Sequence, residues 1–99
     1  MFLPENLSYI LNELGEEREL YFSAIAPPII QTSNFAFKTI ADLRTAFEDE
    51  MSGYLYSRGL NPTVDILRKK LAALDGAEDC LVFGNGAAAI FAAVIANVK

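Results

Sequence analysis

A tyrosine and an arginine stand close together in the segment 53–63, and these two residue types can bind an anion. Tyr56 and Arg58 are separated by one residue, so an extended backbone would point both side chains the same way. The guanidinium offers a planar fork of donors and the phenol adds a hydroxyl, which together suit a phosphate or a carboxylate. Pairing of the arginine with one of the chain's many carboxylates is the simpler alternative, and it stays open at this point.

A glycine-containing turn, Gly84–Ala87, separates an apolar run from an expected helix. The first N–H groups of a helix have no partner within it and lie at the positive end of the helix dipole. A phosphate oxygen fits there, because Gly86 and Ala87 carry little side-chain bulk. The turn lacks the third glycine of G-x-G-x-x-G and the lysine of a P-loop. A tight turn that only needs positive φ at Gly84 or Gly86 is the structural alternative.

The composition excludes several other kinds of site. The 99 residues include no His and a single Cys, which rules out Ser-His-Asp triads and Cys-His pairs and leaves no zinc site to expect. With 8 Lys and Arg against 13 Asp and Glu, the net charge of −5 argues against a binder of nucleic-acid phosphates. The lone Cys80, the acidic first 17 residues and the shortness of the apolar run 87–96 lead us to expect a cytoplasmic protein.

The first half of the sequence predicts two short helices joined by an arm. Residues 1–15 form an amphipathic pattern that Asn6 can cap and Gly15 can end. Residues 16–38 show no period and contain two consecutive prolines, so we expect an arm that lies on a partner subunit or on further polypeptide, with a core strand as the alternative. A helix is expected over 39–51 with Thr39 as its cap. Its acidic end indicates either an earlier end or a nearby cation.

The second half predicts the beginning of an α/β layer. Asn61 and Pro62 are typical of a helix start and Gly76 of a helix end, and Asp65 can pair with Lys69 along this helix. Residues 79–83 suit a buried strand, and residues 87–98 suit a helix that is apolar nearly all round and therefore buried. One strand and one apolar helix do not complete a sheet, so the sequence reads as a truncated piece of a larger fold.

Four stretches occur in the order and with the spacing of a known family. They are Ala26–Phe35, Tyr56–Thr63, Leu71–Glu78 and Gly84–Ile90. They resemble the N-terminal part of the Cys/Met-metabolism enzymes that depend on pyridoxal 5'-phosphate (PLP), such as cystathionine γ-synthase, cystathionine lyases, methionine γ-lyase and O-acetylhomoserine sulfhydrylase. The resemblance implies the large domain of the aspartate aminotransferase-like fold, fold type I. Residues 1–60 would be an arm around a partner subunit and residues 61–99 the start of the PLP-binding domain.

The resemblance also implies roles for the two candidate motifs. Tyr56 and Arg58 would reach the phosphate of PLP in the neighbouring subunit, in a dimer or a dimer of dimers (a homotetramer). Backbone N–H groups of Gly86 and Ala87 would bind the same phosphate within their own subunit. Asn85 stands where the family usually has Ser or Thr, and Ala87 where Met is common, but backbone donation survives both changes.

No catalytic residue is assigned in this chain, because the family's Schiff-base lysine and the other reactive groups lie downstream of the matched part. The resemblance implies a carbon–sulfur lyase or a γ-replacement synthase acting on cystathionine, methionine or O-acylhomoserine, with these 99 residues inactive by themselves. A non-catalytic remnant that serves as a dimerisation or interaction module is the alternative. A small nucleotide-binding domain is disfavoured, since such a site needs more sheet.

Overall fold

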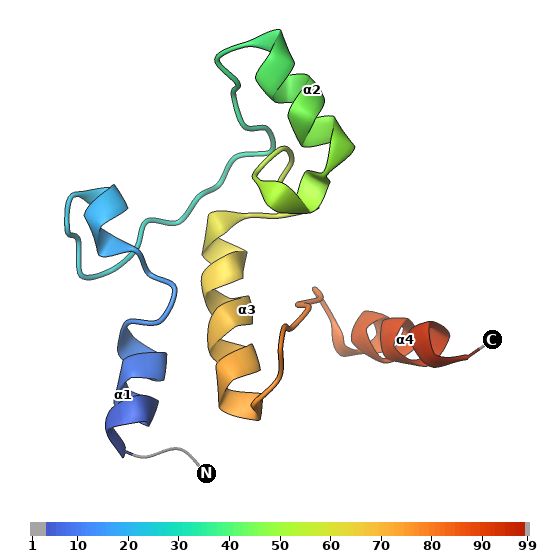
Figure 1. Cartoon of the computed structure of the whole chain (residues 1–99). Helices are drawn as coiled ribbons and strands as arrows, with labels where there is room; N and C mark the ends of the chain where they lie inside the picture. The colour runs from blue at the N-terminus through green and yellow to red at the C-terminus, as the bar shows by residue number, and fades with distance from the viewer. Residues whose placement is uncertain (1–3, 99) are drawn as a thin grey trace.

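The computed structural model describes residues 4–98, and within this range the regular structure is entirely helical (Figure 1). The elements follow the chain as α1 (Pro4–Asn12), η1 (Arg18–Tyr21), α2 (Ile40–Glu48), η2 (Glu50–Ser52), α3 (Pro62–Asp75) and α4 (Gly86–Asn97). The first three residues of the helix expected over 1–15 lie outside the described residues. Asn6 lies inside α1 rather than at its cap, so that expectation was wrong.

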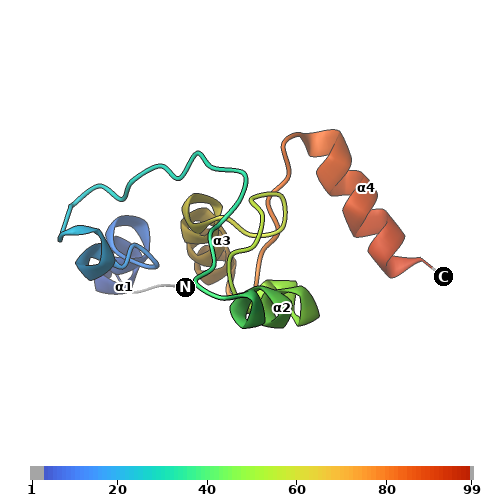
Figure 2. The ribbon, with the colours of Figure 1, turned by 90° about the horizontal axis from the view of Figure 1, so that it is seen from above.

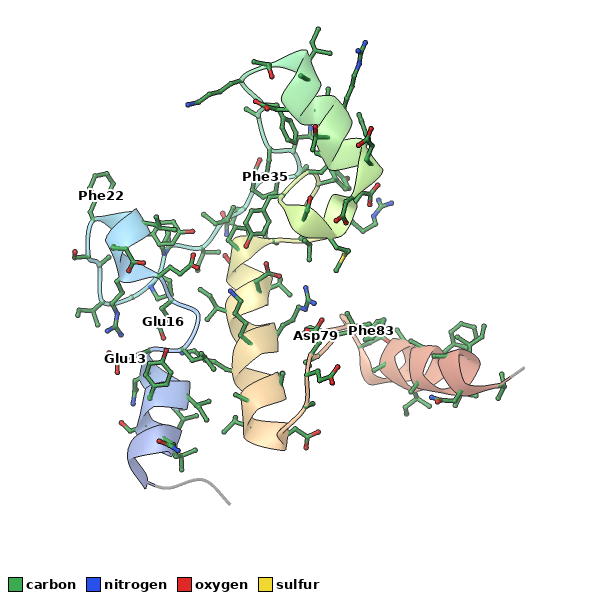
Figure 3. The ribbon with its side chains drawn as sticks, in the orientation of Figure 1. Glu13, Glu16, Phe22, Phe35, Asp79 and Phe83 are labelled. Atoms are coloured by element: carbon green, nitrogen blue, oxygen red, sulfur yellow. The ribbon has the colours of Figure 1, made fainter. Side chains whose placement is uncertain are left out.

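The helix α1 is held by packing against α3, which it meets side by side in Figure 1. Ile10 of α1 is buried, and a helix of this length needs such packing because it is not stable in isolation. A polar contact supports the packing: Lys70 on α3 donates to Glu16 beyond the end of α1 and to the Leu11 carbonyl at 2.8 Å. Glu16 is itself buried (Figure 3 labels it at the turn between α1 and η1).

The helix expected over 39–51 ends earlier than predicted. Thr39 caps it as expected, accepting a hydrogen bond from the Asp42 N–H at 3.1 Å. The α-helical part stops at Glu48, and Asp49 then caps the short helix η2 by accepting from the Met51 N–H. The acidic run Glu48–Glu50 therefore marks the end of one helix and the start of another, and a carboxylate is favourable at a helix start.

The helix α3 begins and ends as its sequence predicts. The Asn61 side chain accepts from the Thr63 N–H at 2.8 Å, and Pro62 occupies the first turn. Gly76 closes the helix with φ 68°, and its N–H bonds to carbonyls of the last turn. The expected pair of Asp65 with Lys69 does not form. Asp65 contacts Arg68 instead, at 3.2 Å.

Replacing Gly76 by alanine is expected to lower the free energy of unfolding by about 1 kcal/mol, because a Cβ is disfavoured at positive φ. An added Cβ would meet nothing within 4 Å, so only the backbone conformation should contribute. Gly53→Ala is the matched control, since this glycine is extended and equally uncrowded. Urea denaturation followed by circular dichroism measures both; equal effects of the two substitutions would contradict the argument.

The segment predicted as a buried strand, 79–83, has no strand partner within the described residues and runs as irregular chain. A strand needs a neighbour to receive its backbone hydrogen bonds, and none of the described segments lies alongside it as one. The helix α4 likewise carries no buried residue, which corrects the expectation that it is covered. Figures 1 and 2 show α4 projecting from the rest of the structure.

The molecule has very little core of its own. Its accessible surface is 7934 Å2 for 10.9 kDa, against about 5,600 Å2 expected for a compact chain of this mass. Its radius of gyration is 16.0 Å, where about 13 Å is usual for this length. The hydrophobic residues that are buried within residues 6–98 are Ile10, Leu60 and Ala72. Most of the large apolar side chains on the helices are therefore exposed to solvent and do not pack against one another.

Candidate functional site

Tyr56 and Arg58 lie together, but a turn rather than an extended backbone brings them there. The Tyr56 carbonyl accepts from the N–H groups of Gly59 at 2.9 Å and Leu60 at 3.3 Å. This turn places the Arg58 guanidinium over the Tyr56 ring, 5.5 Å from its centroid. Stacking on the ring holds the guanidinium without using its N–H donors, which stay free for an anion.

The Arg58 guanidinium is exposed and forms no ion pair within residues 4–98. The simpler alternative from the sequence, an arginine neutralised by a nearby carboxylate, is therefore not what the described residues show. Arg58 and Tyr56 line an open hollow of about 240 Å3 that Glu50 also borders. Glu50 is a residue that sequence reasoning missed, and its carboxylate sets the polarity of one side of this hollow.

The glycine turn leaves two donors free. Asn85 caps α4, with its side chain accepting from the Ala88 N–H at 2.8 Å and its carbonyl from the Ala89 N–H at 3.3 Å. The N–H groups of Gly86 and Ala87 have no acceptor among residues 4–98, and both residues are exposed. An added Cβ at Gly86 would meet nothing within 4 Å. The two donors named from the sequence are thus the two that the cap does not satisfy.

An arginine on α3 ties the segment before the glycine turn to the rest of the site. Arg68 donates to the Cys80 carbonyl at 2.8 Å and to both carboxylate oxygens of Asp79 at 2.9 and 3.0 Å. The same guanidinium contacts Asp65, which accepts from the Tyr54 hydroxyl at 2.8 Å. This network connects the segment that carries Tyr56 with the segment that leads to Gly84, and Figure 3 shows Asp79 and Phe83 between α3 and α4.

Two groups of this network, Tyr54 and Asp79, have pKa values that differ from their ordinary ones. Partial desolvation, and then the hydrogen bond to Asp65, raises the pKa of Tyr54 well above its usual range. The backbone N–H of Cys80 lowers the pKa of Asp79, and Arg68 adds to the effect. Tyr54 therefore stays a neutral donor and Asp79 an anion at neutral pH, which keeps the network intact.

The turn that carries Arg58 and the segment that leads to the glycine turn border one hollow. It measures about 310 Å3, and its lining includes Arg58 from the first motif and Phe83 from the second. Gly86 and Ala87 are not among its lining residues. The structure thus places the two motifs near one another within the chain without joining their donors in one pocket.

The arm contacts its own chain over part of its length. A single antiparallel bridge joins Asn34 to Tyr56, and the Phe35 N–H donates to the Leu55 carbonyl at 3.3 Å. The rings of Phe35 and Tyr54 pack with centroids 5.4 Å apart. These contacts brace the segment just before the Tyr56 turn.

Within residues 4–98, no three side chains of the His, Cys, Asp and Glu types come together as a metal site would require. In the same range, no helix is both long and apolar enough to cross a bilayer.

The family profile described as Cys/Met metabolism PLP-dependent enzyme matches residues 10–99. L-Methionine gamma-lyase of Pseudomonas putida is 36% identical over 76 residues, which are 77% of this chain and 19% of that protein. O-Succinylhomoserine sulfhydrylase of Pseudomonas aeruginosa is 40% identical over 82% of this chain and 18% of that protein. Homocysteine/cysteine synthase of Kluyveromyces lactis is 42% identical over 88% of this chain and 20% of that protein.

The chain therefore belongs to a class of PLP-dependent enzymes. Its family is that of Cys/Met metabolism, whose match extends over nearly the whole sequence. The chain spans about a fifth of the length of the curated relatives it matches. The resemblance read from the four sequence stretches is confirmed.

Proposed function

We propose that these residues are the N-terminal part of a PLP-dependent enzyme of sulfur amino-acid metabolism. The enzyme would be a carbon–sulfur lyase or a γ-replacement synthase acting on cystathionine, methionine or an O-acylhomoserine. The family match over residues 10–99 carries the class of enzyme, and the phosphate site is supported by the observation that both motifs leave donors open to an anion. Arg58 has no carboxylate partner, and the Gly86 and Ala87 N–H groups have no acceptor, within residues 4–98.

In the proposed site, Tyr56 and Arg58 bind the PLP phosphate in the neighbouring subunit of a homo-oligomer. Gly86 and Ala87 bind that phosphate from within their own subunit through backbone N–H groups at the start of α4. A dianionic phosphate suits this set, since the guanidinium, the phenol hydroxyl and the two N–H groups can each donate a hydrogen bond to it, although the Glu50 carboxylate borders the same hollow as Tyr56 and Arg58. The exposure of both motifs in a single chain supports an assembly in which each phosphate is bound by two copies.

When bound, PLP supplies an electron sink for reactions at the amino-acid substrate. The residues of this chain hold and orient it by its phosphate, which fixes the reacting groups relative to the substrate. The proposed fold places residues 61–99 at the start of the α/β domain, where further strands would pair with 79–83 and cover α4. The wide exposure of apolar residues on α4 supports that arrangement. By this proposal the 99 residues are inactive alone, and the full-length enzyme works in the cytoplasm.

Incubation with PLP tests the proposal directly. The full-length protein is expected to turn yellow and to keep the cofactor covalently after borohydride reduction, because a lysine outside these residues carries it. The chain of residues 1–99 treated in the same way is the control, and mass spectrometry should show none of its lysines modified stoichiometrically. A full-length protein that forms oligomers but never takes up PLP would contradict the proposal and favour an interaction module instead.

A further inference from the structure

Asn61 sits where the arm, the Tyr56 turn and α3 meet. Its side chain is buried, with the residue only 7% exposed, although asparagine is usually a surface residue. The amide nitrogen donates to the Ile30 carbonyl at 3.1 Å and to the Ser57 hydroxyl at 3.0 Å. The amide oxygen accepts from the Thr63 N–H at 2.8 Å. Only this last contact is a helix cap, so capping does not account for the two donor contacts.

Ser57 is the residue between Tyr56 and Arg58, and it is fixed through both its backbone and its side chain. Its N–H donates to the Ser33 carbonyl at 2.8 Å. Its hydroxyl donates to the Thr32 carbonyl and accepts from Asn61. The arm is held from the other side as well, because the Ile30 N–H donates to the Thr63 hydroxyl at 2.8 Å.

These contacts leave the turn with little freedom. The Asn61 amide contacts the arm, the turn and the helix start at once. A shift of Ser57 would move Tyr56 and Arg58 with it, because they are its direct neighbours in the chain. A side chain that presets this geometry lowers the cost of ordering the binding groups when the ligand arrives.

We propose that Asn61 is a positioning residue for the phosphate-binding pair Tyr56 and Arg58, an inference that rests on the proposed function. Asn61 does not touch the phosphate. It holds Ser57 against the arm, so that the turn presents the guanidinium and the phenol already oriented.

The test compares PLP dissociation constants of apoenzymes prepared from the full-length protein. Asn61→Ser keeps a good helix cap and removes the amide donors, so the constant should rise about fivefold, as for the loss of a buried hydrogen bond. The affinity for phosphate-free pyridoxal should not change. In an Arg58→Ala background the same substitution should raise the constant by a clearly smaller factor, because only Tyr56 of the pair is left to be positioned. Thr39→Ser, an exchange of the cap of α2, is the control and should leave both affinities unchanged.

A constant that does not rise on Asn61→Ser would overturn the inference. So would an equal factor in both backgrounds, or an equal loss of pyridoxal affinity, because each would indicate a general loss of structure. Ser57→Ala removes the acceptor of the same contact and should repeat the pattern, which covers the case where Asn61→Ser does not fold. If Arg58→Ala itself leaves PLP binding unchanged, the proposed function fails. An effect of Arg58→Ala with none of Asn61→Ser removes the positioning role alone.

Discussion

Substitution of Arg58 by alanine in the full-length enzyme is expected to raise the PLP dissociation constant about 10- to 100-fold. A hydrogen bond to a charged group contributes about 1.5–3 kcal/mol, and each 1.4 kcal/mol is a factor of ten in affinity. Arg58→Lys keeps the charge and loses the planar fork of donors, so its PLP dissociation constant should lie between those of the wild type and Arg58→Ala. Equilibrium titration of the apoenzyme by PLP absorbance measures all three proteins.

The control for this prediction is Arg44→Ala, the same substitution at an exposed arginine on α2. It should leave the constant unchanged, which separates the loss of a specific donor fork from the loss of one positive charge. If Arg44→Ala and Arg58→Ala weaken PLP binding equally, the anion is attracted by net charge only, and the site built on Tyr56 and Arg58 is wrong.

Mixed oligomers distinguish a pair that acts across the interface from one that acts within its own subunit. Gly86→Pro removes one N–H donor at the first position of α4, where proline suits a helix. In a dimer of one Arg58→Ala and one Gly86→Pro subunit, the cross-subunit arrangement gives one site with no defect and one with both. Half of the sites should then bind PLP with wild-type affinity. Action within one subunit gives two sites with one defect each, and no tight binding returns.

The local parts of the fold could be predicted because short-range chemistry decides them. The cap of Asn61 and the helix end at Gly76 depend on neighbours within a few residues, and both are as the sequence indicates. The pair of Asp65 and Lys69 was predicted from spacing alone and does not form. Asp65 instead pairs with Arg68 and accepts a hydrogen bond from the Tyr54 hydroxyl. Tyr54 comes from another segment, and such a partner cannot be predicted from the spacing along one helix.

Parts of the fold that depend on distant partners could not be predicted in this way. The apolar pattern of 79–83 is typical of a buried strand, but a strand exists only where a neighbour pairs with it, and within residues 4–98 none does. The same holds for α4, whose composition predicts burial while the described residues leave it exposed. The composition of a segment indicates that it needs to be buried, but it does not identify the partner segment that would bury it.

In the candidate site, too, the local features could be predicted from the sequence and the contacts between distant residues could not. The donors of Gly86 and Ala87 follow from the general geometry of a helix start, and the structure leaves those two groups unsatisfied as expected. The proximity of Tyr56 and Arg58 was expected for an extended segment, but a turn produces it. The role of the Asn61 amide in holding Ser57 had no sequence signal beyond its cap, because its other partner, Ile30, lies 31 residues away.

A partly buried ion pair supports the packing of α1 on α3, and removing it is the second substitution with a large expected effect. The Glu16 carboxylate accepts from Lys70 at 2.5 Å and from Arg18 at 3.2 Å. The side chains of Glu16 and Lys70 are only 8% and 16% exposed. The hydrogen bond from Lys70 lowers the pKa of Glu16 below its ordinary value of 4.5, with both cations contributing. The pair thus holds the end of α1 against α3 in its charged form.

Lys70→Met is therefore expected to destabilise the docked α1 by about 2 kcal/mol, between the ~1 kcal/mol of an exposed pair and the ~3–5 kcal/mol of breaking a buried one. Amide hydrogen exchange of α1 in the full-length protein should accelerate about 30-fold, since each 1.36 kcal/mol is a factor of ten. Lys69→Met, at the exposed neighbouring position, is the control and should change little. The pH dependence of this difference follows from the lowered pKa of Glu16. Such a carboxylate stabilises the folded state at any pH above its pKa in the unfolded chain, and this stabilisation is lost as the pH falls and the carboxylate is protonated. The difference between wild type and Lys70→Met should accordingly be complete above pH 4.5 and shrink as the pH falls below it. A difference that stays constant down to pH 3 would show that Lys70 acts through its aliphatic stem and not through the charge of Glu16.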